Sequence, residues 1–250
     1  MYQLNYGGGL GIIKEYKGLN KFNYTKNKYR FISGDYETLP SLPTYYNLDT
    51  FDGAATHFPK RRNYYIAYAM FNKPKKYLHT HHHTFVNLPN NHNMKAFKRA
   101  NIKFVNYSKP LEKTDFILES KFIGKKIEKS SVVNPLYIYS LGKVTPRIFL
   151  AEKLVTSQHS YTDQKFYLEL NMLGLRDALV AKDDANDYYN TTFIKGLEID
   201  KKVFSENRVI INFKNFGDGF LIFNQVYTHH WLAKCDDKNI DIIPVNGIMM

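Results

Sequence analysis

Residues 207–247 read NRVIINFKNFGDGFLIFNQVYTHHWLAKCDDKNIDIIPVNG, and this stretch decides the fold of the 250-residue chain. Apolar side chains alternate with period two at 209–213, and residues 220–226 contain a continuous apolar run. The Gly-Asp-Gly tripeptide at 217–219 lies between them and provides residues that adopt the positive φ angles of a tight hairpin. The sequence therefore predicts that 209–213 and 220–226 pair as antiparallel strands.

Two further strands are predicted downstream of this hairpin. A run at 232–235 precedes Asp-Asp-Lys-Asn at 236–239, which has the composition of a turn, and residues 240–245 return as another strand. This last strand has no partner that is visible in the sequence. Residues 191–250 are therefore predicted to form an antiparallel β-domain.

The upstream residues predict a lobe of mixed helices and strands at 29–154. Its periodic segments are strands at 29–33, 102–105, 116–119, 136–140 and 147–151 and helices at 61–71 and 91–99. Residues 1–28 have no sustained period and are expected to be irregular. Residues 155–190 are mostly helical in period and are expected to connect the lobe to the β-domain. The predicted fold class is therefore α+β.

The motifs of residues 207–247 resemble the C-terminal extracytoplasmic β-domain of YfhO-like bacterial membrane proteins. The shared order is N-R-V, strand, G-D-G, strand, W-x-A, acidic turn, strand and P-V-N-G. Two upstream stretches resemble the same family, namely Y-x-L-x-T-x-D-G at 46–53 and MKAFKRANIKFVNYSKPL at 94–111. The chain departs from the family at 227–231, where Tyr-Thr-His-His-Trp stands in place of Tyr-Tyr-Pro-Gly-Trp, and it stops at Met250 without the family's closing strand.

This resemblance implies a fold, a location and a role. The implied fold is a small α/β lobe followed by an antiparallel β-sandwich that is jelly-roll-like and truncated at its last strand, with a hairpin at 136–150. The implied location is the extracytoplasmic face of the bacterial cell membrane, next to the chain's own upstream transmembrane region. Because the family is related to the C-type glycosyltransferases, the implied role is accessory to the transfer of sugars from a lipid carrier to a cell-envelope acceptor. No catalytic residue and no cofactor is carried over to this region.

The composition is that of a folded chain with a strong positive charge. Apolar residues make up 44% and aromatic residues 16%, which is enough for a buried core. No run reaches the roughly 18 uncharged apolar residues that span a bilayer, and the N-terminus lacks the pattern of a secretory signal. The formal charge of +12 attracts polyanions such as cell-surface polymers or anionic lipids, although the codon usage of an AT-rich genome also produces such a lysine-rich sequence. Nucleic acid is not an expected partner, because no nucleic-acid-binding motif is present.

Four residues are candidates for binding the glycan or its lipid phosphate. Arg61 and Arg62 offer bidentate contacts to phosphate, and Trp231 offers a flat apolar face to a sugar ring. Asp52 lies in a polar loop that the resemblance directs toward the membrane-embedded site. Each also has a structural interpretation: Asp52 belongs to an Asp-Gly turn, the arginines lie at a solvated helix start, and the tryptophan belongs to the core.

A histidine run suggests a metal-dependent enzyme as an alternative. His79, His81 and His83 would share one face of an extended strand and could approach a zinc or copper ion if that strand bent. No carboxylate or cysteine follows at a ligand spacing, so a surface loop is the simpler interpretation. The remaining alternative is a free-standing basic protein that binds anionic cell-surface polymers or has a structural role there.

Overall fold

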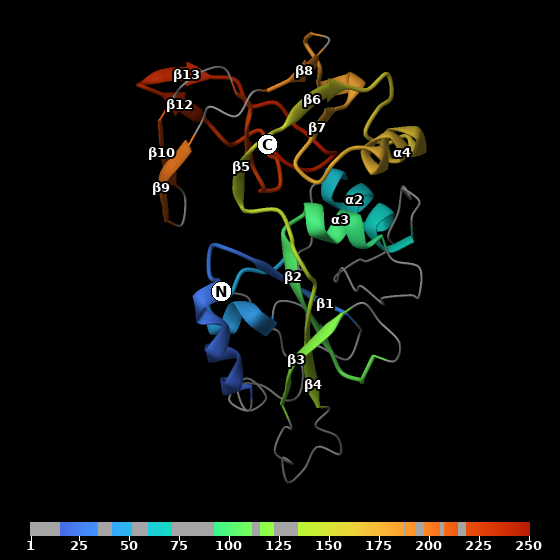
Figure 1. Ribbon diagram of the computed structural model, residues 1–250, viewed down its shortest axis with the longest axis vertical. Helices are drawn as coiled ribbons and strands as arrows, with labels where there is room; N and C mark the ends of the chain where they lie inside the picture. Colours follow the sequence, from blue (N-terminus) through green and yellow to red (C-terminus); the bar gives the residue numbers. More distant parts are fainter. Residues whose placement is uncertain are drawn as a thin grey trace. The chain divides into compact units, whose positions relative to one another are not determined.

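The fold is known from a computed structural model that describes residues 16–34, 42–51, 60–71, 93–111, 116–122, 135–187, 189–193, 198–205, 208–214 and 219–250 (Figure 1). Short helices alternate with many short strands, most of them in antiparallel pairs, so the predicted α+β class is confirmed. The chain forms two units that follow contacts rather than sequence order. Unit 1 comprises Met1–Thr56, Thr80–Asn90 and Asn101–Val144, and unit 2 comprises His57–His79, Asn91–Ala100 and Thr145–Met250. These units differ from the four consecutive segments predicted above.

Unit 1 is a four-stranded sheet with two short 3₁₀ helices. Its elements are η1 (Lys17–Thr25), β1 (Arg30–Ser33), η2 (Leu42–Tyr46), β2 (Ile102–Tyr107), β3 (Ile117–Phe122) and β4 (Leu136–Ser140). The strand order is β1-β2-β4-β3, in which β1 and β2 are parallel and the other pairs are antiparallel. The predicted strands in this region are therefore confirmed, whereas residues 17–25 are helical instead of irregular.

Aromatic side chains hold the core of unit 1 together. The rings of Phe31 on β1 and Phe104 on β2 stack at 4.7 Å, and Phe22 of η1 packs against Phe104 at 5.2 Å with its edge toward the ring. All three side chains are buried. A Cβ at Gly18 would lie 2.1 Å from the ring of Phe122, so a larger residue there would require this ring to move where η1 approaches β3.

Unit 2 combines three helices with several small sheets. Its elements are α2 (Lys60–Phe71), α3 (Met94–Arg99), β5 (Ile148–Leu150), β6 (Lys153–Thr156), α4 (Gln164–Met172), β7 (Ala178–Val180), η3 (Lys182–Asp184), β8 (Asn190–Thr192), β9 (Glu198–Phe204), β10 (Val209–Lys214), β11 (Leu221–Phe223), β12 (Ala233–Cys235) and β13 (Lys238–Ile240). The sheets are β7-β6-β8, β5-β11, β9-β10 and β12-β13. Only β6 and β7 are parallel.

The helices of unit 2 agree with the sequence and are fixed by polar contacts. The predicted helix at 61–71 is α2, and α3 begins where the Asn93 side chain accepts a hydrogen bond of 3.1 Å from the backbone N–H of Ala96. The buried Tyr65 hydroxyl of α2 donates to the Ala96 carbonyl at 2.8 Å. These contacts join α2 to α3.

The predicted pairing of 209–213 with 220–226 is wrong. β10 pairs with β9, and β11 pairs with β5. The backbone N–H of Ser205 donates to the Arg208 carbonyl at 2.9 Å, so the pairing of β9 with β10 ends before the chain reaches the Gly-Asp-Gly tripeptide. β11 takes its partner from a strand 71 residues earlier in the chain, since Leu221 pairs with Leu150, so contacts across the fold rather than loop length decide its pairing.

Two other predictions also need correction. Residues 155–190 are not mostly helical, because in addition to α4 they contain the end of β6, the whole of β7 and the first residue of β8. The strands of the hairpin expected at 136–150 do not pair with each other, since β4 pairs with β2 and β3 while β5 pairs with β11. Strands of three residues such as β7 are too short for a period to be recognised.

The turn predicted at 236–239 is confirmed for its first two residues, whereas 238 and 239 already belong to β13, and the strand predicted at 240–245 is wrong because residues 241–244 are not in a strand. Asp236 and Asp237 have φ angles of 47° and 64°, as a two-residue turn between β12 and β13 requires. The chain then returns to the core, where residues 244–250 are all buried. The backbone of Met250 pairs with that of Phe223, and Asn246 bonds to Leu179 of β7. Among the helices in the described ranges, none has the length and apolar character needed to cross a bilayer.

Candidate functional site

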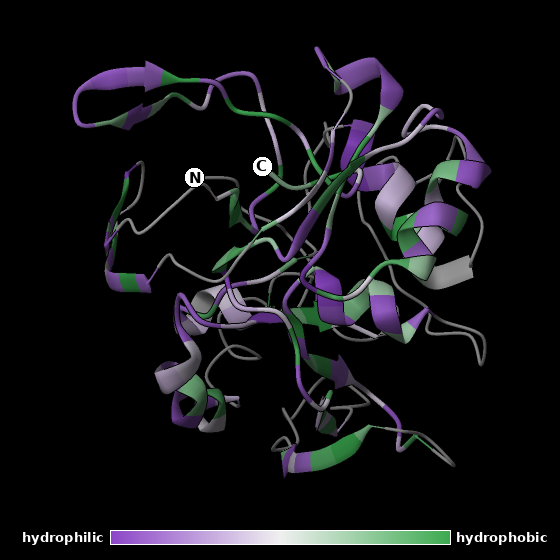
Figure 2. Cartoon of the chain, turned by 45° about the horizontal axis from the view of Figure 1, so that its top comes forward, coloured by the Kyte–Doolittle hydropathy of each residue, from purple (hydrophilic) through white to green (hydrophobic). Residues whose placement is uncertain are grey.

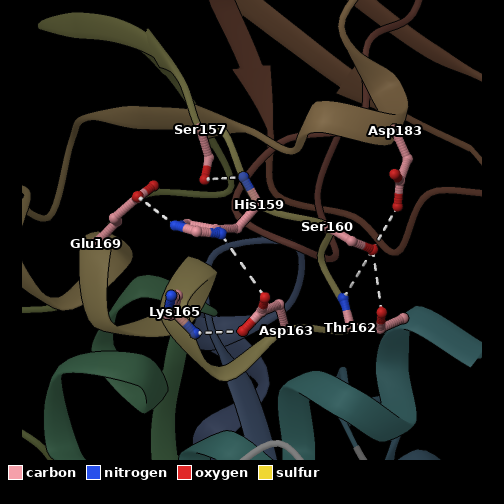
Figure 3. Close-up of polar contacts among 8 residues, drawn as sticks. All are labelled: Ser157, His159, Ser160, Thr162, Asp163, Lys165, Glu169 and Asp183. Atoms are coloured by element: carbon pink, nitrogen blue, oxygen red, sulfur yellow. Dashed lines mark hydrogen bonds and ion pairs between the residues drawn. The ribbon is translucent and has the colours of Figure 1, made fainter.

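A polar loop at residues 157–163 connects β6 to α4 and is held firmly by its backbone. The N–H of Ser157 donates to the Val180 carbonyl at 2.8 Å, and the carbonyl of His159 accepts from the N–H of Lys182 at 3.0 Å. The Ser157 hydroxyl oxygen accepts a further bond of 3.0 Å from the backbone N–H of His159 (Figure 3). The loop therefore presents its side chains from a fixed backbone.

His159 lies between two carboxylates. Its Nδ1 is 3.6 Å from Asp163, and its Nε2 is 3.5 Å from Glu169 (Figure 3). The three side chains are 28%, 45% and 41% exposed, respectively. Asp163 also caps α4, since its other oxygen accepts from the N–H of Lys165 at 2.9 Å. Only a doubly protonated imidazole can donate toward both carboxylates at once.

Hydroxyl groups continue the polar surface on the other side of the loop. The Ser160 hydroxyl donates to the Asp183 carboxylate and lies 3.0 Å from the Thr162 hydroxyl (Figure 3). Asp183 belongs to η3, which follows directly after β7 in the sequence. The loop thus carries two polar groups, one of carboxylates around the His159 imidazole and one of Ser160, Thr162 and Asp183.

Arg61 anchors the same loop from α2. Its guanidinium forms a bidentate pair with Asp184, with one bond of 2.8 Å, and it stacks on the Tyr161 ring at 3.9 Å. The side chains of this ion pair are only 14% and 8% exposed. Burial raises the pKa of Asp184, and the neighbouring Arg61 acts in the opposite direction. A phosphate at Arg61 would therefore have to compete with a carboxylate that is already bound there.

Two half-buried tyrosine rings, those of Tyr161 and Tyr227, lie near the Arg61 guanidinium. The centroid of the Tyr227 ring lies 5.8 Å from the guanidinium, and Tyr227 precedes Trp231 by four residues in the sequence. Tyr64 of α2 packs edge-on against Tyr161 at 6.0 Å. We call His159, Tyr161, Asp163, Glu169, Asp183 and Tyr227 the loop site.

The residues predicted from sequence fall in different places. Arg61 lies beside the loop site, whereas Arg62 is a buried residue of α2. Trp231 is partly exposed and packs edge-on against Phe223 at 5.9 Å. Asp52 and the histidine run, His79, His81 and His83, lie outside the described residues. Within the residues that the structure does describe, no group of three His, Cys, Asp or Glu side chains is arranged to hold a metal ion.

The loop site offers polar and aromatic groups that can contact a ligand. His159 Nε2 faces a carboxylate, and the hydroxyl of Ser157 is used by the loop backbone, so these groups do not form a nucleophile and base pair. Oxygen and nitrogen atoms beside aromatic rings are the groups that bind sugar hydroxyls and ring faces. Sequence reasoning missed His159, although the polar segment Ser-Gln-His-Ser-Tyr-Thr-Asp at 157–163, directly before a helix, carried the signal.

Comparison with known proteins does not assign this chain to a family. No protein-family model matches it, and neither the curated proteins nor the solved structures contain a match.

Proposed function

We propose that this chain is the extracytoplasmic region of a YfhO-like bacterial membrane protein and that it holds a glycan for a membrane-embedded sugar transferase. The glycan is a cell-envelope polymer or a lipid-linked acceptor. The observation that carries the proposal is the loop site, in which the 157–163 loop presents His159 between two partly exposed carboxylates and also presents Tyr161, whose ring stacks on Arg61. The sequence resemblance supplies the cellular context.

The chemistry of the loop site supports a sugar ligand. Glu169 and Asp163 accept hydrogen bonds from hydroxyl groups, and His159 donates or accepts according to its protonation state. The half-buried faces of Tyr161 and Tyr227 match the apolar face of a sugar ring. The role of the chain is to position its ligand, because the reacting groups belong to the membrane part in this proposal.

A free-standing binding protein for anionic cell-surface polymers is the second candidate, and the formal charge of +12 favours it. The two candidates differ in what the gene encodes upstream of Met1. A series of hydrophobic helices there supports the first, and a stop codon followed by a signal peptide supports the second.

Glycan binding is tested by titrating the purified chain with soluble cell-wall oligosaccharides in a calorimeter. Replacing Glu169 with alanine removes an acceptor from the loop site and is expected to weaken binding about tenfold, the effect of one good hydrogen bond to a charged group. Glu152→Ala is the matched control, because Glu152 is 51% exposed and pairs with Arg176 at 3.7 Å outside the loop site. Equal affinities for the two variants would contradict a role of the loop site.

The location is tested with Cys235, which is the chain's single cysteine and is partly exposed on β12. In intact cells that express the full gene, a membrane-impermeant maleimide is expected to label this thiol. Cys235→Ser identifies the signal that comes from this position. Labelling that requires permeabilised cells would place the chain in the cytoplasm and reject the proposal.

A further inference from the structure

A basic segment containing the 3₁₀ helix η1 lies at the surface of unit 1. Residues 16–34 contain no Asp or Glu, although the whole chain has 23 of these residues, and they carry lysines at 17, 21, 26 and 28. Buried side chains recur at every third position along the helix, as three residues per turn require. They belong to Tyr16, Leu19, Phe22 and Thr25. The other two faces of η1 are therefore directed away from the core.

Every exposed side chain at 17–28 is a lysine, an asparagine or a tyrosine. These side chains are Lys17, Asn20, Lys21, Asn23, Tyr24, Lys26 and Lys28. In the hydropathy colouring of Figure 2, hydrophilic and hydrophobic residues alternate along η1. Because side chains three residues apart eclipse one another in a 3₁₀ helix, four of the exposed ones form a row that is about 18 Å long at a rise of about 2.0 Å per residue. The row consists of Lys17, Asn20, Asn23 and Lys26, and we call it, together with Tyr24, the η1 ridge.

Tyr24 belongs to the second exposed face of the helix, next to the row, and its ring is supported from beneath. Its side chain is 62% exposed, yet its ring stacks on the buried ring of Phe22 with centroids 6.4 Å apart. Lys21, on the same face, donates to the Ser120 hydroxyl of β3 and lies 5.4 Å from the ring of Phe122. The second face is therefore anchored to β3, and the Tyr24 ring remains accessible from a supported position.

Two carboxylates bring negative charge to this part of unit 1, and hydrogen bonds already occupy both. Asp49 accepts a bond of 2.7 Å from the backbone N–H of Asn27. Glu119 of β3 interacts electrostatically with Tyr24, and it accepts a bond from the Ser140 hydroxyl. The four lysines of the segment outnumber these two acids, so the surface around the η1 ridge is positive.

We propose that the η1 ridge binds an acidic polysaccharide, a chain of sugar rings with one negative charge per repeat. The ammonium groups at the two ends of the row attract the charges, and the amides of Asn20 and Asn23 between them both donate to and accept from hydroxyl groups. The exposed ring of Tyr24 offers an apolar face to a sugar ring. This inference goes beyond the proposed function, because it names a second surface, on unit 1, and the charge of its ligand.

Two features of the segment favour a polysaccharide over single-stranded nucleic acid. Surfaces that bind single strands stack successive bases on several aromatic rings. On η1, which the structure describes in full, Tyr24 is the one exposed ring. Arginine makes the bidentate contacts that recognise phosphate groups, and the arginine of this segment, Arg30, is buried.

The test is a calorimetric titration of the purified chain with oligogalacturonate at low ionic strength. The double variant Lys17→Gln, Lys26→Gln is expected to bind about fivefold more weakly, because it lacks the charges at both ends of the row. Lys234→Gln, Lys238→Gln is the matched control, since it removes the same charge from exposed lysines of β12 and β13 and is expected to change the affinity less than about twofold. Circular dichroism checks that both double variants are folded.

Tyr24→Ala separates stacking from charge. It is expected to weaken the binding of oligogalacturonate about fivefold and that of inorganic polyphosphate, which has no rings, by much less. Absence of binding by the parent chain, equal losses in the two double variants, or an equal effect of Tyr24→Ala on both ligands would overturn the inference. Tighter binding of an oligothymidylate strand of equal charge would overturn it in favour of nucleic acid. The loop site is tested separately through Glu169, so the inference can fail while the proposed function stands.

Discussion

Two buried asparagines illustrate how much depends on hydrogen bonding at the scale of single residues. Asn224 is 1% exposed, and its Nδ2 donates to the Arg99 carbonyl at 2.7 Å and to the Thr145 hydroxyl at 3.2 Å. Asn106 on β2 is fully buried, and neither its Oδ1 nor its Nδ2 has a hydrogen-bond partner in the part of the chain that the structure describes. The hydrogen-bonded amide of Asn224 therefore stabilises the fold, whereas the unbonded amide of Asn106 destabilises it.

We expect Asn106→Leu to raise the free energy of unfolding by about 1–2 kcal/mol, because it removes an unsatisfied amide and keeps a similar volume. Asn224→Leu is expected to lower it by about 1–3 kcal/mol, because that amide is bonded. Denaturant unfolding followed by circular dichroism measures both. A loss of stability for Asn106→Leu would show that a water molecule or ligand satisfies this amide in solution.

Residue identities predicted turns better than they predicted sites. The Asp-Asp pair at 236–237 marked a turn from composition alone, since Asp tolerates positive φ and bonds to its own backbone. The loop site was not predicted, because Glu169 lies 10 residues from its partner His159 and Asp183 lies 23 residues from its partner Ser160, and these pairs meet only through the packing of α4 and η3. Arg61 was identified, but its partner Asp184, 123 residues away, was not.

At the scale of elements, the position of most strands and helices followed from periodicity, whereas their partners did not. β10 and β11 are both near their predicted positions, yet each pairs with a strand that the hairpin prediction did not consider. Periodicity reports which face of a segment is buried and carries no information on which neighbour covers it. The pairing depends instead on contacts made across the fold.

One buried cation secures the end of α4. Arg99 is 2% exposed, and its guanidinium donates to the carbonyls of Leu170, Leu173 and Gly174 at 3.1, 3.1 and 2.7 Å. These carbonyls belong to the last turn of the helix and the residues after it, where backbone acceptors lack partners within the helix and the helix dipole favours a cation. Arg99 therefore links α3 to α4.

Arg99→Met is expected to lower the free energy of unfolding by about 2–4 kcal/mol, because three carbonyls lose a charged donor. Arg176→Met is the control. Its guanidinium is 44% exposed and lies 3.7 Å from Glu152, so its loss is expected to change stability by less than about 1 kcal/mol. Chemical denaturation measures the free energy of unfolding of both variants. Equal midpoints for Arg99→Met and Arg176→Met would contradict the role of Arg99 in joining α3 to α4.

At the scale of the whole molecule, buried tyrosines make the free energy of unfolding depend on pH above 10. Burial raises the pKa of Tyr68 to about 12, with Arg99 and Asn93 opposing it, and burial also raises the pKa of Tyr167 well above its ordinary value of 10.0. The Tyr68 hydroxyl donates a hydrogen bond to Asn171 Oδ1. The ionised form of Tyr68 has no proton to donate and cannot make this bond. Both groups therefore stay protonated in the folded chain at a pH where they ionise in the unfolded chain.

The stabilisation from these tyrosines is complete below pH 10 and is lost as the pH rises through the raised folded values. We expect the free energy of unfolding to fall by about 1.4 kcal/mol per pH unit for Tyr68 between pH 10 and 12. In Tyr68→Phe the fall should be shallower, although this variant starts lower because it lacks the bond to Asn171. Urea midpoints against pH measure the slopes, and parallel curves would exclude Tyr68 as a cause.

The interleaving of the two units along the chain has a consequence for biosynthesis. Unit 1 is complete when residue 144 has left the ribosome, whereas unit 2 begins at residue 57 and needs Met250 to pair with Phe223. At about 5–20 residues per second, synthesis of the 179 residues that follow α2 takes roughly 9–36 seconds, and during this time the aromatic residues of α2 lack part of their unit. A chaperone that shields tyrosine-rich segments during translation would therefore assist this protein more than one that acts after release.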